Sequence, residues 1–221
     1  MSLAYVIGDI HGCYHTLVSA IEQINAIREE EDYIIFLGDY FDRGNFNAEV
    51  YHFLRKIEAD ENYPNVVFLR GNHEQMQLDA INSRNKVMLW FYNGGNVTSD
   101  DFTEAQISPT QVKDWIEKMP HAYYNDELDF YCVHSHLPHC HIEDFDEEEL
   151  KDCIWLRKPS EVGKRVFHGH TPHNFTLVRN NDINLDTGCV FGGGLSYAMV
   201  SKNCFGITTV PTHELDKVNL R

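Results

Sequence analysis

The sequence predicts an α/β fold in which two mixed sheets lie between outer helices, a four-layer α/β/β/α sandwich. The first third alternates apolar segments of strand length with amphipathic helical segments, which is typical of parallel strands joined by crossover helices. The last third contains six short strand-like segments separated by turns. We therefore expect a parallel sheet, a second sheet packed on its face, and helices over both outer surfaces.

The elements of the first third follow from apolar periodicity. Strands are expected at residues 3–9, 34–37 and 66–69, because each segment is a short apolar run bounded by polar or turn residues. Helices are expected at 14–28 and 47–59, where apolar residues recur at helical spacing. Further helices are expected near 74–80 and 87–90, with the glycine-rich residues 93–96 ending the second of them.

The middle of the chain, residues 97–128, has a looser pattern. Ser108 followed by Pro109 is a typical helix start, and the apolar residues that follow it predict a helical flank over the sheet. The six later strands are expected at 130–133, 166–168, 175–178, 183–185, 195–200 and 205–210, with a hairpin turn at 192–194. The chain contains no linker rich in Gly, Ser and Pro, so we expect residues 1–221 to form a single domain.

Composition limits the possible partners. The 221 residues carry a net charge of −16, which argues against nucleic-acid and anionic-membrane partners. An anionic substrate is still possible, because metal ions can reverse the charge inside a cleft. Six cysteines without a CxxC pair indicate neither a disulfide framework nor a thiolate zinc site. With no basic-then-apolar leader and no apolar run of membrane-spanning length, a cytoplasmic setting is expected.

Side chains that bind metals stand at the ends of five predicted strands. They are Asp9, His11, Asp39, Asn72, His134 and His170. Ligands in α/β proteins gather beyond the carboxyl ends of strands, so these tips predict one shared site. Carboxylate, imidazole and amide ligands suit a borderline divalent cation, and Asp39 could bridge two ions with its two oxygens.

Each of these positions can also be explained without a metal site, as a turn residue or as a hydrogen-bonded histidine of the core. Independent turns have no reason to carry ligand residues at five strand ends, so the set as a whole favours a site. The histidine-rich residues 134–141 could instead form an accessory zinc site or a substrate-contacting loop. We expect His139 and His141 to lie in a solvated loop, and the role of His136 is left open.

Three segments carry a resemblance to a known family: GDIHG (8–12), GDYFDRG (38–44) and GNHE (71–74). They resemble the signature blocks of the PPP-type metallophosphatases, within the calcineurin-like metallophosphoesterase superfamily. The similarity continues through WLR (155–157), HGHTP (168–172) and DTG (186–188). The sequences NHEQM (72–76) and NGG (93–95) are most similar to the small bacterial and phage branch.

The resemblance implies a role for each matching residue. One metal ion would be held by Asp9, His11 and Asp39, and a second by Asp39, Asn72, His134 and His170. Arg43 and Arg157, with Asn72, would bind the phosphate oxygens, because guanidinium groups bind them bidentately. His73 would protonate the leaving alkoxide, and Asp42 would orient its imidazole.

The function predicted on this basis is hydrolysis of phosphate monoesters by hydroxide activated between two divalent ions, with no covalent intermediate. The ions are expected to be manganese, although iron and zinc also fit the ligands. The substrate is expected to be a phosphorylated protein or a small phosphoester. A protein substrate would be dephosphorylated at serine or threonine, or, with dual specificity, also at tyrosine. The alternatives are a symmetrical diadenosine tetraphosphate hydrolase and, from another class, a catalytically silent binding module.

Overall fold

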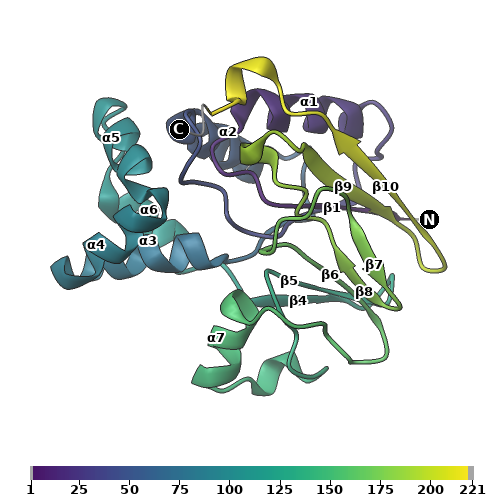
Figure 1. The fold of residues 1–221 in the computed structure, drawn as a ribbon. Helices are drawn as coiled ribbons and strands as arrows, with labels where there is room; N and C mark the ends of the chain where they lie inside the picture. The colour runs from purple at the N-terminus through teal and green to yellow at the C-terminus, as the bar shows by residue number, and fades with distance from the viewer. Residues whose placement is uncertain (1, 219–221) are drawn as a thin grey trace.

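The computed structural model describes residues 2–218, which form two five-stranded sheets packed face to face (Figure 1). The first sheet has the strand order β10-β9-β1-β2-β3 and the second β4-β5-β6-β8-β7. The strands are β1 (Ala4–Ile7), β2 (Tyr33–Phe36), β3 (Val66–Phe68), β4 (Ala122–Asn125), β5 (Phe130–Val133), β6 (Arg165–His168), β7 (Leu177–Arg179), β8 (Asp182–Asn184), β9 (Leu195–Val200) and β10 (Phe205–Val210).

In the first sheet, β1, β2 and β3 are arranged as predicted, but the other two strands are not those expected. β1, β2 and β3 are parallel neighbours, as the alternation of strand and helix indicates. β9 and β10, which were expected in the second sheet, instead extend the first, with β9 antiparallel to β1. That expectation was wrong because short apolar strands do not encode their partners. β9 is buried along most of its length, as a strand paired on both sides should be.

The second sheet also differs in detail. Its parallel strands β5, β6 and β8 carry β4 and β7 as antiparallel edge strands. β4 was not predicted, because residues 122–125 form a short, half-buried segment without a clear apolar run. Residues 192–194 do not close a hairpin, since the strands before and after them belong to different sheets. They carry the chain from the second sheet back to the first.

Helices cover both outer faces and one side of the sandwich (Figure 1). They are α1 (Tyr14–Asn25), α2 (Asn47–Ala59), α3 (Asn72–Asn82), α4 (Val87–Trp90), α5 (Asn96–Glu104), α6 (Pro109–Ile116) and α7 (Glu147–Trp155). The predicted break at 93–96 is confirmed, because the backbone leaves the helical conformation at Gly94. Residues Phe91–Gly95 form a kink between α4 and α5, where Gly94 takes a φ of 100° that glycine adopts readily.

Apolar side chains fill three interfaces, which confirms the four-layer arrangement. In β1, Tyr5 and Ile7 pack toward α1 and α2, whereas Ala4 and Val6 pack between the sheets. This alternation follows from the two-residue period of a strand, and burial on both faces explains why β1 reads as an unbroken apolar run. A third cluster, which includes Cys153, lies between α7 and the second sheet.

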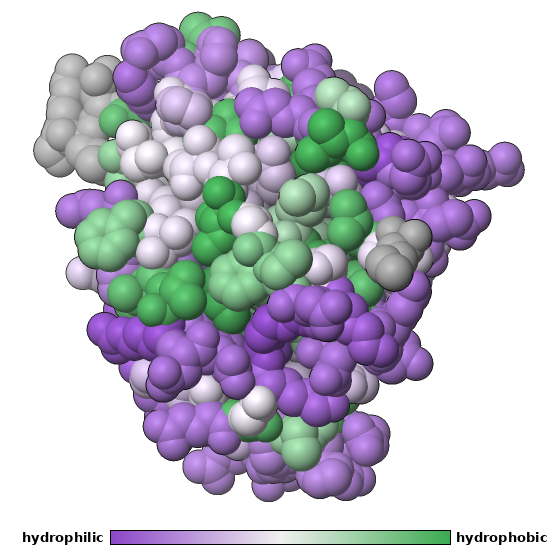
Figure 2. All heavy atoms as spheres, turned by 90° about the vertical axis from the view of Figure 1, so that its right-hand side faces the viewer, coloured by the Kyte–Doolittle hydropathy of each residue, from purple (hydrophilic) through white to green (hydrophobic). Residues whose placement is uncertain are grey.

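The outer surface mixes apolar and hydrophilic side chains. On the face at the right of Figure 1, apolar residues gather across the middle, with hydrophilic residues around them (Figure 2). This is the pattern expected where the layered interior reaches the edge of a sandwich. Within residues 2–218, no helix combines the length and apolar character needed to cross a bilayer.

Candidate active site

The five predicted strand tips meet around Asp39. This residue follows β2, and its two carboxylate oxygens face different histidines. Oδ2 lies 3.5 Å from Nε2 of His11, beyond β1, and Oδ1 lies 3.3 Å from Nε2 of His134, beyond β5. The site therefore draws on both sheets, and all of these side chains are buried.

The loop that carries Asp39 is held by Glu74, in the first turn of α3. The buried Glu74 carboxylate accepts hydrogen bonds from the backbone N–H groups of Asp39, Tyr40 and Gly71, at 2.8, 2.9 and 3.0 Å. These bonds join the tips of β2 and β3. Sequence reasoning assigned no role to Glu74, although it stands beside His73 in the GNHE segment.

Strained backbone is concentrated in this region. Among residues 2–218, eight non-glycine residues have positive φ, and five of them belong to the candidate site: His11, Asp39, Asp42, Arg43 and His170, with φ between 48° and 74°. Such conformations cost free energy and persist where the surrounding structure imposes them, which is common at functional sites.

Two histidines have the same supporting hydrogen bond. Nδ1–H of His11 donates to the carbonyl oxygen of Phe41 at 2.7 Å, and Nδ1–H of His134 donates to that of Leu37 at 2.9 Å. Both carbonyls belong to the segment around Asp39. A hydrogen bond at Nδ1 leaves Nε2 as the lone-pair nitrogen, and Nε2 of both rings faces the Asp39 carboxylate.

His170 and Asn72 complete the side of the site nearest the second sheet. Oδ1 of Asn72 lies 3.0 Å from Nε2 of His134 and 2.9 Å from Nδ1 of His170. Asp39, His134 and His170 bring one ligand atom each within 4.8 Å of one another, close enough to hold a metal ion.

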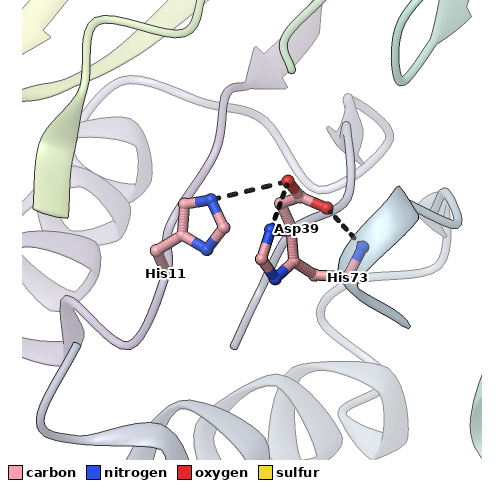
Figure 3. A group of neighbouring side chains, drawn as sticks. All are labelled: His11, Asp39 and His73. Atoms are coloured by element: carbon pink, nitrogen blue, oxygen red, sulfur yellow. Dashed lines mark hydrogen bonds and ion pairs between the residues drawn. The ribbon is translucent and has the colours of Figure 1, made fainter. Parts of the chain in front are cut away.

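The other side of the site differs from the predicted ligand set. The residues that come within the same distance are His11, Asp39 and His73 (Figure 3), rather than His11, Asp39 and Asp9. Asp9 lies nearby. Its carboxylate accepts the backbone N–H of His170 at 3.0 Å, and a Cβ on Gly169 would overlap it. The Asp9 carboxylate thus packs against the tip of β6.

The electrostatics of the cluster fit a bound cation. Burial, and then the nearby Asp186 carboxylate, raise the pKa of Asp9 well above its ordinary value. Burial lowers the pKa of His170 to about 3. Burial alone would lower the pKa of His134, but the Asp39, Asp9 and Glu74 carboxylates together outweigh it and raise that pKa to about 10. A cation would replace the proton on His134 and compensate the crowded carboxylates.

His73 contacts Asp42 through the ring nitrogen that points away from Asp39. Its Nδ1 lies 2.6 Å from Oδ2 of Asp42, and its Nε2 faces the cluster, 4.0 Å from Oδ2 of Asp39. Asp42 is itself held by the indole of Trp90 and the hydroxyl of Thr98. Neither Trp90 nor Thr98 was singled out from sequence, because they lie on α4 and α5 with no spacing that ties them to Asp42.

Two arginines line a cavity of about 210 Å³ over the cluster, together with His11, His170 and Phe191. Arg43 Nη1 lies 2.6 Å from Nε2 of His11, and Arg157 Nε lies 3.3 Å from Nε2 of His170. Asp186 reaches the same cavity and was not predicted as a site residue. Guanidinium groups on two sides of a small cavity suit the binding of an oxyanion.

Of the histidine-rich residues 134–141, His134 belongs to the Asp39 cluster, whereas His139 and His141 make other contacts. His139 pairs with Glu149 on α7 at 3.0 Å, and His141 lies near Glu143 and Asp144 on the exposed surface. His136 is buried, and its Nδ1 has no hydrogen-bond partner among the described residues.

The sequence profile described as "Calcineurin-like phosphoesterase" matches residues 4–200, which include every side chain of the cluster. The chain belongs to the calcineurin-like phosphoesterase family. Members of this metallophosphoesterase family hydrolyse phosphoester bonds at a divalent metal centre, and the Asp and His groups around Asp39 could bind metal. The predicted resemblance to metallophosphatases is therefore confirmed.

Two curated relatives of this calcineurin-like phosphoesterase differ in activity. Serine/threonine-protein phosphatase 2 of Salmonella typhimurium is 28% identical over 210 residues, covering 87% of this chain and 90% of the relative. A symmetrical bis(5'-nucleosyl)-tetraphosphatase of a Marinomonas species is 28% identical over 136 residues, covering 62% of this chain and 45% of the relative.

A solved structure confirms the fold. A protein serine/threonine phosphatase from Saccharomyces cerevisiae superposes with a TM-score of 0.68 at 14% identity, covering 96% of this chain and 81% of that one. At this identity the match concerns the fold alone.

Proposed function

We propose that this phosphoesterase is a protein serine/threonine phosphatase with two divalent metal ions, most readily manganese. The observation that carries the proposal is the position of Asp39, whose two oxygens face His11 and His134 separately. One ion would be held by Asp9, His11 and Asp39, and the other by Asp39, Asn72, His134 and His170. A carboxylate that presents one oxygen to each of two histidines suits a bridging ligand.

The bound metal centre would supply Lewis-acid charge and a water activated at neutral pH. Arg43 and Arg157 would bind the phosphoryl oxygens and orient the phosphorus toward that water. His73 would donate its Nε2 proton to the leaving alkoxide as the P–O bond breaks, giving an alcohol and inorganic phosphate. Asp42 would keep Nδ1–H of His73 in place and stabilise the imidazolium.

His73 also lies within reach of a metal ion, and the proposal assigns it to proton transfer. The 2.6 Å contact with Asp42 supports this role, because a carboxylate partner orients the histidine ring. Asp9 would then be the third ligand on that side, and the strand-tip position of its carboxylate supports the assignment.

The extent of similarity favours a protein substrate. The chain spans 90% of the Salmonella phosphatase but only 45% of the Marinomonas tetraphosphatase. The match to the tetraphosphatase still supports a second candidate, a symmetrical diadenosine tetraphosphate hydrolase.

We further propose that residues 1–221 act as a single domain. A reducing, cytoplasmic setting is supported by six free cysteines.

A cleavage panel tests the proposal. The manganese-loaded protein is given phosphoserine, phosphothreonine and phosphotyrosine peptides and diadenosine tetraphosphate, with Asp39→Asn as the inactive control. We expect release of phosphate from the phosphoserine and phosphothreonine peptides. Hydrolysis of diadenosine tetraphosphate alone would establish the second candidate. A protein that neither releases phosphate from the peptides nor converts diadenosine tetraphosphate to ADP would overturn both.

A further inference from the structure

A second hollow adjoins the candidate active site, and we propose that it binds a second phosphoryl group of the substrate. This inference rests on the proposed function and narrows its substrate class to molecules with two phosphoryl groups. The hollow lies at the second sheet and is lined in part by Arg157, Lys158, His168, His173 and Arg179.

Arg157 joins the hollow to the active-site cavity, because its side chain lines both. On one side its Nε lies 3.3 Å from His170, in the Asp39 cluster. On the other side stand Lys158 and Arg179, the latter at the end of β7. A substrate with one phosphoryl group over the cluster could therefore place another in the hollow, on the far side of one arginine.

The charge of the hollow is opposite to that of the chain. The chain carries a net charge of −16, yet three of its 18 lysines and arginines line this one hollow. Within residues 2–218, Arg157, Lys158 and Arg179 form no ion pair with a carboxylate. Unpaired cations gathered in a concave site favour an anionic ligand.

The carboxylate in the hollow, Asp182, is paired with His168 and not with any of these three cations. Asp182 accepts the backbone N–H of Ser160 at 2.8 Å and lies 3.2 Å from Nε2 of His168, so its oxygens already have partners. The arginine and lysine charges therefore remain available to a ligand. Arginine binds phosphoryl oxygens bidentately, and lysine adds a point charge.

The size of the hollow limits what enters it. Its volume is about 190 Å³, below the range of roughly 300–1,000 Å³ that is usual for pockets that enclose a small molecule. It therefore suits one group of a larger substrate. The second phosphoryl group could belong to a neighbouring phosphorylated residue of a peptide or to the polyphosphate chain of a dinucleotide.

The test removes the two cations that lie outside the active-site cavity. The variant Lys158→Gln/Arg179→Gln is compared with Lys151→Gln/Lys202→Gln, which removes the same charge from two exposed lysines outside the hollow. Binding of dye-labelled peptides with one or two phosphoserines is followed by fluorescence anisotropy on the manganese-loaded proteins, each also carrying His73→Asn so that the peptides are not hydrolysed during the measurement. Unlabelled AMP and diadenosine tetraphosphate are used as competitors.

We expect the wild-type protein to prefer two-phosphate ligands, and the Lys158/Arg179 variant to reduce this preference about tenfold, as expected for two exposed charge-assisted contacts. The control variant should keep the preference. A loss confined to the peptides or to the dinucleotide would identify the source of the second group.

Equal weakening of one- and two-phosphate ligands, a loss reproduced by the control, or no wild-type preference would overturn the inference. The proposed function is measured separately, through hydrolysis of p-nitrophenyl phosphate. A protein that fails this hydrolysis but keeps the Lys158/Arg179-dependent preference would overturn the proposed function alone.

Discussion

The indole Nε1–H of Trp90 reaches both carboxylate oxygens of Asp42, at 3.1 and 2.9 Å. Asp42 is almost fully buried and in turn contacts His73, so α4 is connected to the candidate proton donor through one carboxylate. The hydroxyl of Thr98, on α5, donates to the same carboxylate at 2.6 Å. The helices α4 and α5 thus orient Asp42, a residue of the site, whereas the metal-ligand candidates stand at strand tips of the two sheets.

Trp90→Phe tests this connection, because it keeps an aromatic ring and removes the N–H donor. We expect the free energy of unfolding to fall by about 1–3 kcal/mol, since a buried carboxylate loses a hydrogen bond. We also expect kcat on alkyl phosphates to fall more than kcat on p-nitrophenyl phosphate. Trp115→Phe removes an indole bond to Glu58 away from the site and should lower stability without this leaving-group effect. Identical kinetics in the two variants would contradict the positioning role.

His73→Asn tests proton donation. A poor leaving group needs the proton and a good one does not, so the loss on alkyl phosphates should be on the order of 10²–10⁴-fold, and much smaller on p-nitrophenyl phosphate. The metal content of the variant should equal that of the wild type. A variant that loses metal and loses equal activity on both substrates would make His73 a ligand instead of an acid.

Removal of the metal ions should abolish hydrolysis. The cluster around Asp39 concentrates buried carboxylates and imidazoles, and without cations it has neither the charge nor the activated water that attack on an anionic ester requires. Treatment with excess chelator should therefore stop the release of phosphate, and added manganese should restore it. Full activity in the presence of chelator would refute metal dependence.

Gly169→Ala tests the contribution of Asp9. A Cβ at this position would overlap Oδ1 of Asp9 and displace the carboxylate. We expect metal affinity to fall by about 10- to 100-fold, the range seen when the residues that orient metal ligands are disturbed, as measured by metal titration. Gly206→Ala is the matched control, because a Cβ there meets no atom within 4 Å. Unchanged affinity in Gly169→Ala would remove Asp9 from the ligand set.

The lowered pKa of His121 predicts how the free energy of unfolding depends on pH. Burial, with a smaller effect of the Arg70 charge, lowers the pKa of His121 to about 4. The unfolded chain would bind this proton near pH 6.5, so the folded state loses stability as pH falls from about 6.5 to 4. Discounted for partial exposure, the loss is about 1–2 kcal/mol. Urea unfolding at pH 7.5 and pH 5 should show a smaller decrease for His121→Gln than for the wild type, and equal decreases would contradict the assignment.

Much of the fold could be predicted because its elements are encoded locally. α2, β5, β9 and β10 have the predicted bounds, since each shows clear periodicity between turn residues. The sheet to which β9 and β10 belong could not be predicted, because strand pairing joins residues far apart in the sequence. β4 was missed for a related reason, since its pairing with β5 outweighed a weak local signal. The break at Gly94 was predicted, because a glycine pair is a local signal.

For the site, the sequence by itself determined which side chains stand at the strand tips. A short apolar strand followed by Gly-Asp or by histidine is a local pattern, so Asp9, Asp39 and His134 could be named without coordinates. Only the tertiary structure decided that Asp39 faces a different histidine with each oxygen, that Glu74 holds its loop, and that Trp90 reaches Asp42. The physical reason is that these contacts depend on how the two sheets and the helical flank pack, and no spacing along the chain encodes that packing.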